Sequence, residues 1–143
     1  MPPGVVFSIG TTRRAAVACQ RATLVAVVED EALVLAGYEM LFESWGYQVV
    51  GATSVAEAVG KLRATAQVPD IIIADYRLKD GETGVDAIHA IRGLCGRAIP
   101  SILVTGDTAT DRVRQAVTGG LPILHKPVNS VQLQALLTSC LAV

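Results

Sequence analysis

Short apolar runs alternate with longer amphipathic segments from Leu24 to the end of the chain. Runs of this length predict strands, and the amphipathic segments between them predict helices. The predicted strands are Leu24–Val28, Tyr47–Val50, Ile71–Ala74, Ile99–Val104 and Leu121–Leu124. The three consecutive isoleucines of the third run are typical of a strand that is covered on both faces. Alternation of five such strands with helices predicts an α/β fold with a parallel sheet and right-handed crossovers.

The first two predicted helices carry apolar residues at helical spacing. In the segment 31–44, the predicted apolar face consists of Leu33, Val34, Gly37, Met40 and Leu41. Gly46 is expected to end this helix. The second helix is expected to begin after Ser54, an N-cap whose capping box is completed by Glu57 three positions later.

Three further helices are predicted in the second half of the chain. One spans Val85 to Leu94, after a charged, glycine-rich loop at Lys79–Gly84. Another begins at Asp107 or Thr108 and ends at Gly119-Gly120. The last is capped by Asn129 or Ser130, with an apolar face of Val131, Leu133, Leu136 and Leu137.

Length and composition predict one domain with a single buried core. The chain has 143 residues, of which 51% are apolar and 17% are charged, and this balance argues against disorder. No apolar run approaches the roughly 18–20 residues of a membrane-spanning helix. No basic region precedes the first apolar stretch, as a secretory signal would require. We therefore expect a cytoplasmic protein with no membrane insertion.

Charge and cysteine content exclude further classes. The net charge is −1 and there is no long basic run, so nucleic-acid binding is not expected. Cys19, Cys95 and Cys140 are odd in number and widely spaced, which gives neither a disulfide framework nor a metal-binding pair. They are predicted to be small buried or half-buried side chains.

Side chains that can bind a ligand or take part in a reaction follow four of the predicted strands. They are Glu29 and Asp30, Asp75, Thr105, and Lys126. Each one alone has an ordinary explanation: an aspartate that begins a turn, a solvated acidic pair or helix cap, a strand threonine, a surface lysine. The carboxyl ends of parallel strands lie along one edge of a sheet, however, so all of these side chains are expected to meet there.

Three converging carboxylates predict a cation site. Glu29, Asp30 and Asp75 would repel one another at close range, and a hard divalent cation would relieve that repulsion. Mg²⁺ suits such oxygen ligands and keeps waters for an incoming phosphate. A lysine and a hydroxyl beside a carboxylate match phosphoryl transfer to that carboxylate. We expect Asp75 to be the nucleophile, and Glu29 and Asp30 to hold the metal.

The four strand-end segments together resemble the receiver domain of two-component response regulators. The resemblance extends over roughly residues 24–143, and its segments are Val27-Val28-Glu29-Asp30-Glu31, Ile71-Ile72-Ile73-Ala74-Asp75, Val104-Thr105-Gly106 and His125-Lys126-Pro127. It implies a flavodoxin-like (βα)5 three-layer sandwich, whose five-stranded parallel sheet has the order 2-1-3-4-5. The domain is expected to span residues 23–143.

The resemblance also implies roles for individual residues. Asp75 would accept a phosphoryl group from a histidine kinase or histidine phosphotransfer protein. Mg²⁺ would be held by Glu29, Asp30, Asp75 and the backbone carbonyl of Arg77. Thr105 and Lys126 would bind the phosphoryl oxygens, and the Lys126-Pro127 bond is expected to be cis.

The chain departs from the family pattern at two places. They concern how a phosphorylation signal is passed on and what kind of larger protein contains the domain. The family often has an aromatic residue three positions before the lysine, where this chain has Ile123. The loop after Asp75 lacks the Met-Pro pair of many transcription regulators and looks more like that of hybrid sensor histidine kinases. Residues 1–22 are expected to be a tail or linker. Their segment Gly4–Ile9 resembles the last strand of a histidine-kinase ATP-binding domain, and an unrelated tail is the alternative.

The predicted function is therefore a phosphorelay module, with no enzymatic turnover beyond its own phosphorylation and dephosphorylation. The alternatives left open are a stand-alone single-domain regulator, a phosphate sink, a degenerate assembly module and a phosphatase-like enzyme. A haloacid-dehalogenase-type phosphatase would need an Asp-x-Asp spacing that Glu29-Asp30-Glu31 does not supply. The oligomeric state, including a homodimer, is also left open.

Overall fold

The computed structural model describes residues 22–106 and 121–141. Their elements are β1 (Leu24–Val28), α1 (Ala32–Ser44), β2 (Gln48–Ala52), α2 (Val55–Thr65), β3 (Ile71–Asp75), a 3₁₀ turn η2 (Lys79–Gly81), α3 (Gly84–Cys95), β4 (Ser101–Thr105), β5 (Ile123–His125) and α5 (Ser130–Leu141). Three predictions lie outside these residues: the N-terminal segment with Gly4–Ile9, the residue Cys19, and the helix expected between Asp107 or Thr108 and Gly119-Gly120.

The sheet has five parallel strands in the order β2-β1-β3-β4-β5. This confirms the parallel α/β architecture and the strand order that the family resemblance implied. The register pairs Val28 of β1 with Ala74 of β3, and Asp75 of β3 with Val104 of β4. The strand ends that carry the predicted site are therefore neighbours.

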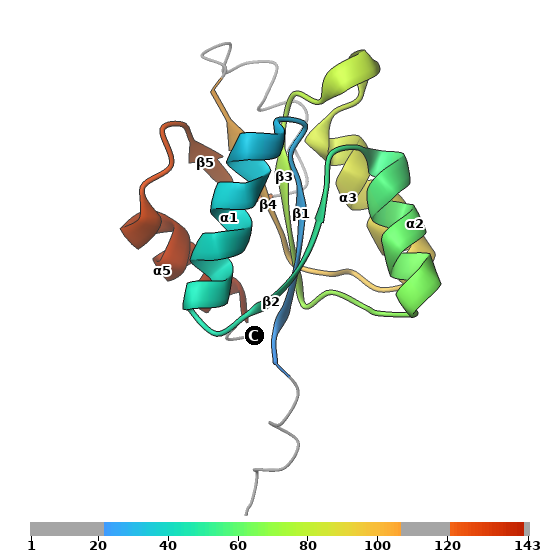
Figure 1. Ribbon diagram of the computed structural model, residues 1–143, viewed down its shortest axis with the longest axis horizontal. Coiled ribbons are helices and arrows are strands. Elements are labelled where there is room, and N and C mark those ends of the chain that lie inside the picture. The colour runs from blue at the N-terminus through green and yellow to red at the C-terminus, as the bar shows by residue number, and fades with distance from the viewer. Residues whose placement is uncertain (1–21, 107–120, 142–143) are drawn as a thin grey trace, which may run out of the picture.

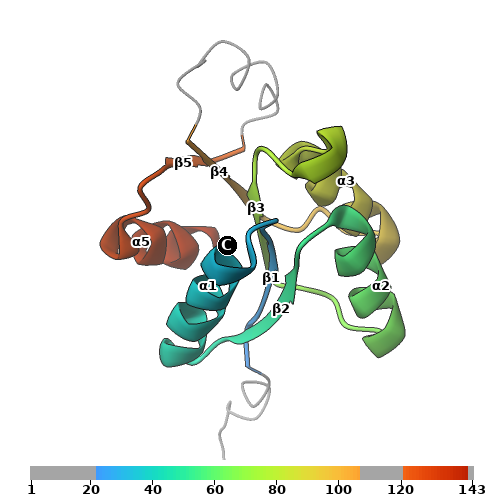
Figure 2. The same cartoon turned by 45° about the horizontal axis from the view of Figure 1, so that its top comes forward.

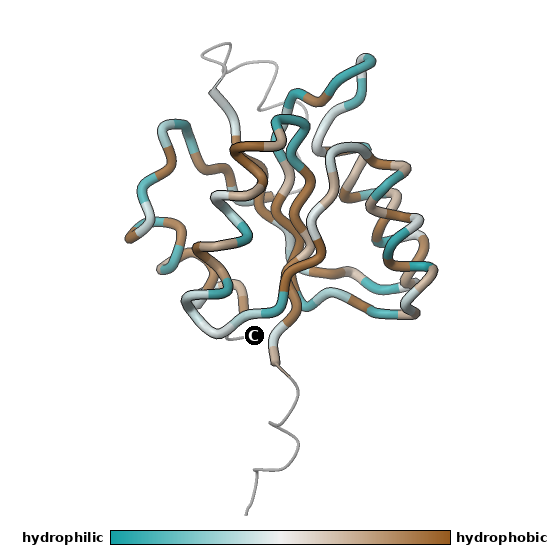
Figure 3. The backbone as a smooth tube through the Cα atoms, in the orientation of Figure 1, coloured by the Kyte–Doolittle hydropathy of each residue, from teal (hydrophilic) through white to brown (hydrophobic). Residues whose placement is uncertain are grey.

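Helices cover both faces of the sheet. In Figures 1 and 2, α1 and α5 lie on one side of the strands, and α2 and α3 lie on the other. Successive strand side chains point to opposite faces. Ile73 thus packs with α1 and α5, while its neighbour Ile72 packs with α2 and α3. Figure 3 shows the central strands as the most apolar part of the trace, as expected for strands covered on both sides.

Strand boundaries differ from the predicted ones in four of the five strands, and in β3 the difference is only that Asp75 is included. The second strand begins at Gln48 and continues to Ala52, because Gly51 and Ala52 pair with the end of β1. The fourth begins at Ser101, directly after Pro100. The fifth is Ile123–His125, and the preceding Pro122 contributes its carbonyl to the amide of Leu103 at 3.0 Å.

The predicted apolar face of α1 was wrong. The buried residues of this helix are Leu35, Tyr38 and Phe42, whereas Leu33 is 89% exposed and Met40 is 71% exposed. Apolar side chains surround much of this helix, so spacing alone did not determine which stripe faces the sheet. Val131 of α5 was also placed on the apolar face by prediction, and it is 74% exposed.

Helix starts follow capping chemistry, with one change. Ser54 caps α2 by accepting from the amide of Glu57 at 3.1 Å. The predicted return bond was wrong, because the Glu57 carboxylate accepts instead from the amide of Thr53 at 2.6 Å. A full capping box occurs at α3, between Thr83 and Asp86. That helix therefore starts at Gly84, inside the segment predicted to be a loop.

Candidate functional site

Asp75 ends β3 at the centre of the carboxyl edge of the sheet. It is 8% exposed, and its backbone pairs with Val104 of β4. The next amide, that of Tyr76, donates to the carbonyl of Val104 at 2.7 Å. Asp75 also lines a cavity of about 340 Å³ together with Arg77, Thr105, Gly106 and Lys126. The acid is therefore fixed in position while its carboxylate faces an open space.

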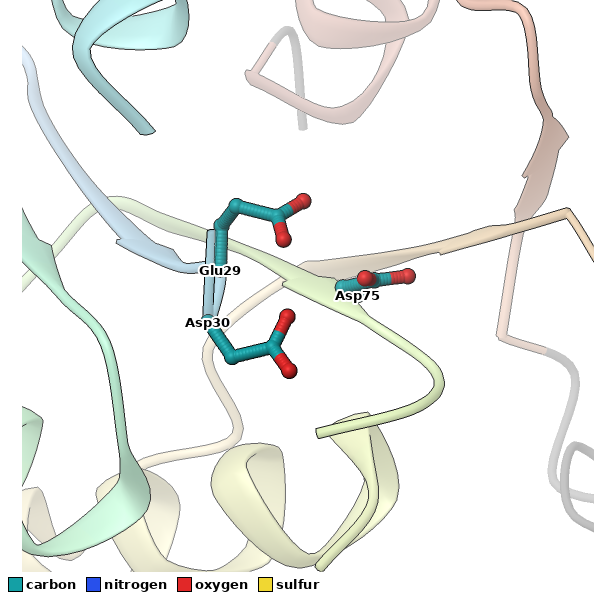
Figure 4. A group of neighbouring side chains, drawn as sticks. All are labelled: Glu29, Asp30 and Asp75. Atoms are coloured by element: carbon teal, nitrogen blue, oxygen red, sulfur yellow. The ribbon is translucent and has the colours of Figure 1, made fainter. Parts of the chain in front are cut away.

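Glu29 and Asp30 follow β1 and lie beside Asp75, as Figure 4 shows. One carboxylate oxygen of each residue lies within 4.8 Å of the others. The amide of Glu29 continues the strand pairing by donating to Ala52 at 3.0 Å, and the amide of Glu31 donates to Glu29 Oε2 at 3.1 Å. The predicted acidic cluster is thus present.

Lys126 approaches the cluster from the end of β5. Its Nζ lies 3.2 Å from Asp75 Oδ2 and 3.7 Å from Glu29 Oε1. Its amide donates to the carbonyl of Thr105 at 2.8 Å, which holds the two residues next to each other. The Lys126-Pro127 bond is cis, as expected. Thr105 is buried and lines the same cavity as Asp75.

Burial and the neighbouring charges together shift the pKa values within this cluster. Burial raises the pKa of Glu29 from 4.5 to about 7, with a further upward contribution from the charge of Asp75, against the amide of Glu31 and the charge of Lys126. Burial also raises the pKa of Asp75, although the hydrogen bond from Lys126 opposes this. Burial alone would lower the pKa of Lys126, but the hydrogen bond and charge of Asp75 raise it above its ordinary value.

The donor set fits a hard divalent cation. Glu29 Oε1 is buried, and no hydrogen bond from the described residues reaches it. A cation among the three carboxylates would coordinate this oxygen directly and offset their mutual repulsion. Arg77, whose backbone carbonyl was expected to complete the ligand set, lines the cavity beside Asp75. Its role as a ligand stays a prediction.

The sequence did not draw attention to two residues at this site. Tyr38 of α1 is buried, and burial together with the charges of Glu29 and Asp75 raises its pKa. Its four-residue spacing from Phe42, on which its ring stacks, was the available signal. Gly84 lies against the backbone of Asp75, and a threonine followed three positions later by an aspartate was the signal for the helix start there.

The sequence model of the response regulator receiver domain matches residues 25–138. The regulator PhyR of Methylorubrum extorquens is 27% identical over 128 residues, which are 87% of this chain and 45% of that protein. The transcriptional regulatory protein ZraR of Escherichia coli K12 is 32% identical over 117 residues, 81% of this chain and 26% of that protein. The chain therefore spans less than half the length of these curated relatives.

Solved receiver structures share the fold. A response regulator receiver protein from Pseudomonas putida is 30% identical, with a TM-score of 0.71 over 83% of this chain and 98% of that one. The anti-anti-sigma factor PhyR from Bartonella quintana is 32% identical, with a TM-score of 0.68 over 89% of this chain and 50% of that one. Within the part of the chain that the structure describes, no helix is both long enough and apolar enough to cross a membrane.

Proposed function

Because this chain belongs to the family of response regulator receiver domains, we propose that it accepts a phosphoryl group on Asp75 from a phosphohistidine donor. The observation that carries this proposal is the 3.2 Å contact between Lys126 Nζ and Asp75 Oδ2, beside the carboxylates of Glu29 and Asp30. An ammonium, a buried hydroxyl and an acidic cluster around one central carboxylate are the parts that phosphoryl transfer to that carboxylate requires.

Each residue has a separate task in this proposal. An oxygen of Asp75 forms a bond to phosphorus as the bond from phosphorus to the donor nitrogen breaks. Lys126 turns from the carboxylate toward a phosphoryl oxygen and keeps its positive charge beside it. The Thr105 hydroxyl donates to a second phosphoryl oxygen. Mg²⁺, held by Glu29, Asp30, Asp75 and the carbonyl of Arg77, would supply charge neutralisation at the phosphoryl group.

A surface beside the site suits a helical phosphodonor. A groove of about 440 Å³ runs between α1 and the start of α5; it is lined by Glu31, Val34, Gly37, Tyr38, Leu41, Lys126, Pro127, Val128 and Ser130. Leu33 and Val131 are exposed on the same two helices. The groove shares Lys126 with the Asp75 cavity, so a helix seated on it would bring a side chain close to Asp75. We propose that a histidine kinase or histidine phosphotransfer domain docks on this α1–α5 groove.

For context, we propose that the domain belongs to a hybrid sensor histidine kinase. The loop after Asp75, Tyr76-Arg77-Leu78-Lys79-Asp80-Gly81, supports this because it lacks the Met-Pro pair of many transcription regulators. Curated relatives such as PhyR and ZraR are regulators, so a stand-alone regulator is the alternative. Sequencing the gene upstream decides between the two, because the absence of a kinase core there would remove the hybrid assignment.

Acetyl phosphate tests the central proposal without a protein partner. We expect intact-mass measurement to show one added phosphoryl group when the protein is incubated with acetyl phosphate and Mg²⁺, and none with chelator. Asp75→Asn should abolish the addition. Asp80→Asn is the matched control, because Asp80 is an exposed acid on the following loop, and it should be phosphorylated like the wild type. Phosphorylation of Asp75→Asn, or turnover of a free substrate, would contradict the proposal.

A further inference from the structure

The first residue of α3, Gly84, lies so close to the backbone of Asp75 that a side chain at this position would not fit. A Cβ built on Gly84 would lie 2.6 Å from the backbone oxygen of Asp75 and 2.7 Å from Leu103 Cδ2. Contacts between a Cβ and another heavy atom do not occur at such distances. One of the two obstacles is the backbone of the phosphoacceptor itself, which cannot turn aside as a flexible side chain can.

The first turn of α3 is also tied to the strand end by hydrogen bonds. The amide of Gly84 donates to the carbonyl of Tyr76 at 2.9 Å, and the amide of Leu78 donates to the carbonyl of Glu82 at 3.0 Å. These bonds flank the antiparallel bridge between Arg77 and Thr83. The capping box of Thr83 and Asp86 fixes the start of the helix on the other side. A shift of Gly84 would therefore move the end of β3 as well.

We propose that Gly84 is a positioning residue for Asp75, whose missing side chain lets α3 seat against the phosphoacceptor backbone and hold the carboxylate beside Lys126 and the acidic cluster. The inference rests on the proposed function, because it concerns the same phosphoryl site. Glycine is needed here for space and not for backbone freedom, since Gly84 belongs to a regular helix and has no left-handed φ.

The same helix contains a matched control. A Cβ on Gly93 would meet no described atom within 4 Å outside the backbone of its own helix. Alanine has a higher helix propensity than glycine, so Gly93→Ala should stabilise the protein. By propensity alone Gly84→Ala would do the same, and the steric argument predicts the opposite outcome.

The test compares Gly84→Ala, Gly93→Ala and the wild type at a temperature where urea titration shows each to be fully folded. We expect Gly84→Ala to lower the rate of Asp75 phosphorylation by acetyl phosphate between about tenfold and a hundredfold, as for a small misplacement of a reacting group. It should also raise the Mg²⁺ concentration for half-maximal rate, and Gly93→Ala should change neither. A folded Gly84→Ala with wild-type rate and Mg²⁺ dependence would overturn the proposal.

A double variant separates positioning from packing. Gly84→Ala with Leu103→Val removes the contact with Leu103 Cδ2 and leaves the contact with the Asp75 backbone oxygen. We expect this variant to recover thermal stability relative to Gly84→Ala but not the rate of phosphorylation. Recovery of both would show that Gly84 acts through Leu103 alone, and would overturn the role toward Asp75.

A measurement on the wild type covers the case in which the variants do not fold. Amide NMR signals are followed during addition of Mg²⁺. The signal of Gly84 should move together with those of Glu29 and Asp30, whereas that of Gly93 should not. If the acidic residues respond and Gly84 does not, the inference about Gly84 fails. If the acidic residues do not respond and the wild type is not phosphorylated, the proposed function fails instead.

Discussion

Helices α3 and α1 cover opposite faces of one sheet, and α3 packs more tightly against the sheet than α1 does. On the α3 side, Gly84 leaves no room for a Cβ and Ile88 is completely buried. On the α1 side, Leu33 and Met40 are exposed and the α1–α5 groove is open to Lys126. We propose that the closed face holds Asp75 in place for phosphorylation, while the open face offers apolar surface to a partner. On this proposal, the two faces divide the positioning of the acid from the recognition of the partner.

The largest expected effect comes from Ile88, on the closed face. Truncating a fully buried isoleucine leaves a cavity, so Ile88→Ala should lower the free energy of unfolding by about 2–5 kcal/mol. Leu33→Ala, on the open face, should stay within about 0.5 kcal/mol of the wild type because Leu33 is 89% exposed. Urea denaturation measures both. A similar loss from Leu33→Ala would break the comparison, since it would mean that this face is covered.

The second expected effect is a pH dependence of the free energy of unfolding. It arises at Glu29, which lies at the carboxyl edge of the sheet, between the two faces. Burial raises the pKa of Glu29 from 4.5 to about 7, so the native state binds a proton more tightly than the unfolded chain does. The resulting stabilisation is complete below pH 4.5 and is lost as the pH rises through 7. Without Mg²⁺, the free energy of unfolding should therefore fall by about 3 kcal/mol over this range.

Glu29→Gln is the control for this pH dependence, because it removes the titrating group and keeps the shape. The variant should show a flatter dependence in chelator, with the slope that remains coming from Asp75, whose pKa is also raised by burial. If the free energy of unfolding of the wild type rose with pH between 5 and 7, the raised pKa of Glu29 would be contradicted. The measurement must resolve a change of about 1.4 kcal/mol, which corresponds to one pKa unit.

The smallest expected effect is on recognition. Leu33→Ser with Val131→Ser removes exposed apolar area from α1 and α5, the two helices that flank the α1–α5 groove. We expect phosphotransfer from a histidine kinase that phosphorylates the wild type to slow by about tenfold, equivalent to about 1.4 kcal/mol. The rate with acetyl phosphate should not change, because the small donor needs no docking surface. Equal loss with both donors would place these residues in the chemistry, and no loss with either would remove the groove as the docking surface.

Much of the fold and the site could be predicted because parallel topology constrains both. Once β1, β3, β4 and β5 are parallel neighbours, the residues after them must meet, and Glu29, Asp75 and Lys126 do. The buried face of α1 could not be predicted in the same way. Leu33 and Leu35 are equally apolar, and tertiary packing determined which of them is covered.

Gly84 was beyond prediction for another reason. A glycine in a charged loop is ordinary, and its significance lies in a contact with Asp75, nine positions earlier, that sequence periodicity does not encode. The capping box that starts α3 at this residue is a local signal, but it reports where the helix begins and not what it touches. Packing distances between elements are the part that only the structure supplied.

The strand order also has a consequence for synthesis of the protein. Asp75 and Lys126, which contact each other in the folded domain, are 51 positions apart, and β5 is the last of the five strands of this sheet to leave the ribosome. A nascent chain that ends before β5 has its acidic residues but not the ammonium that faces them. Under the role proposed for Lys126, such a chain should not compete for phosphodonors, and the capacity for phosphorylation would depend on completion of the whole sheet.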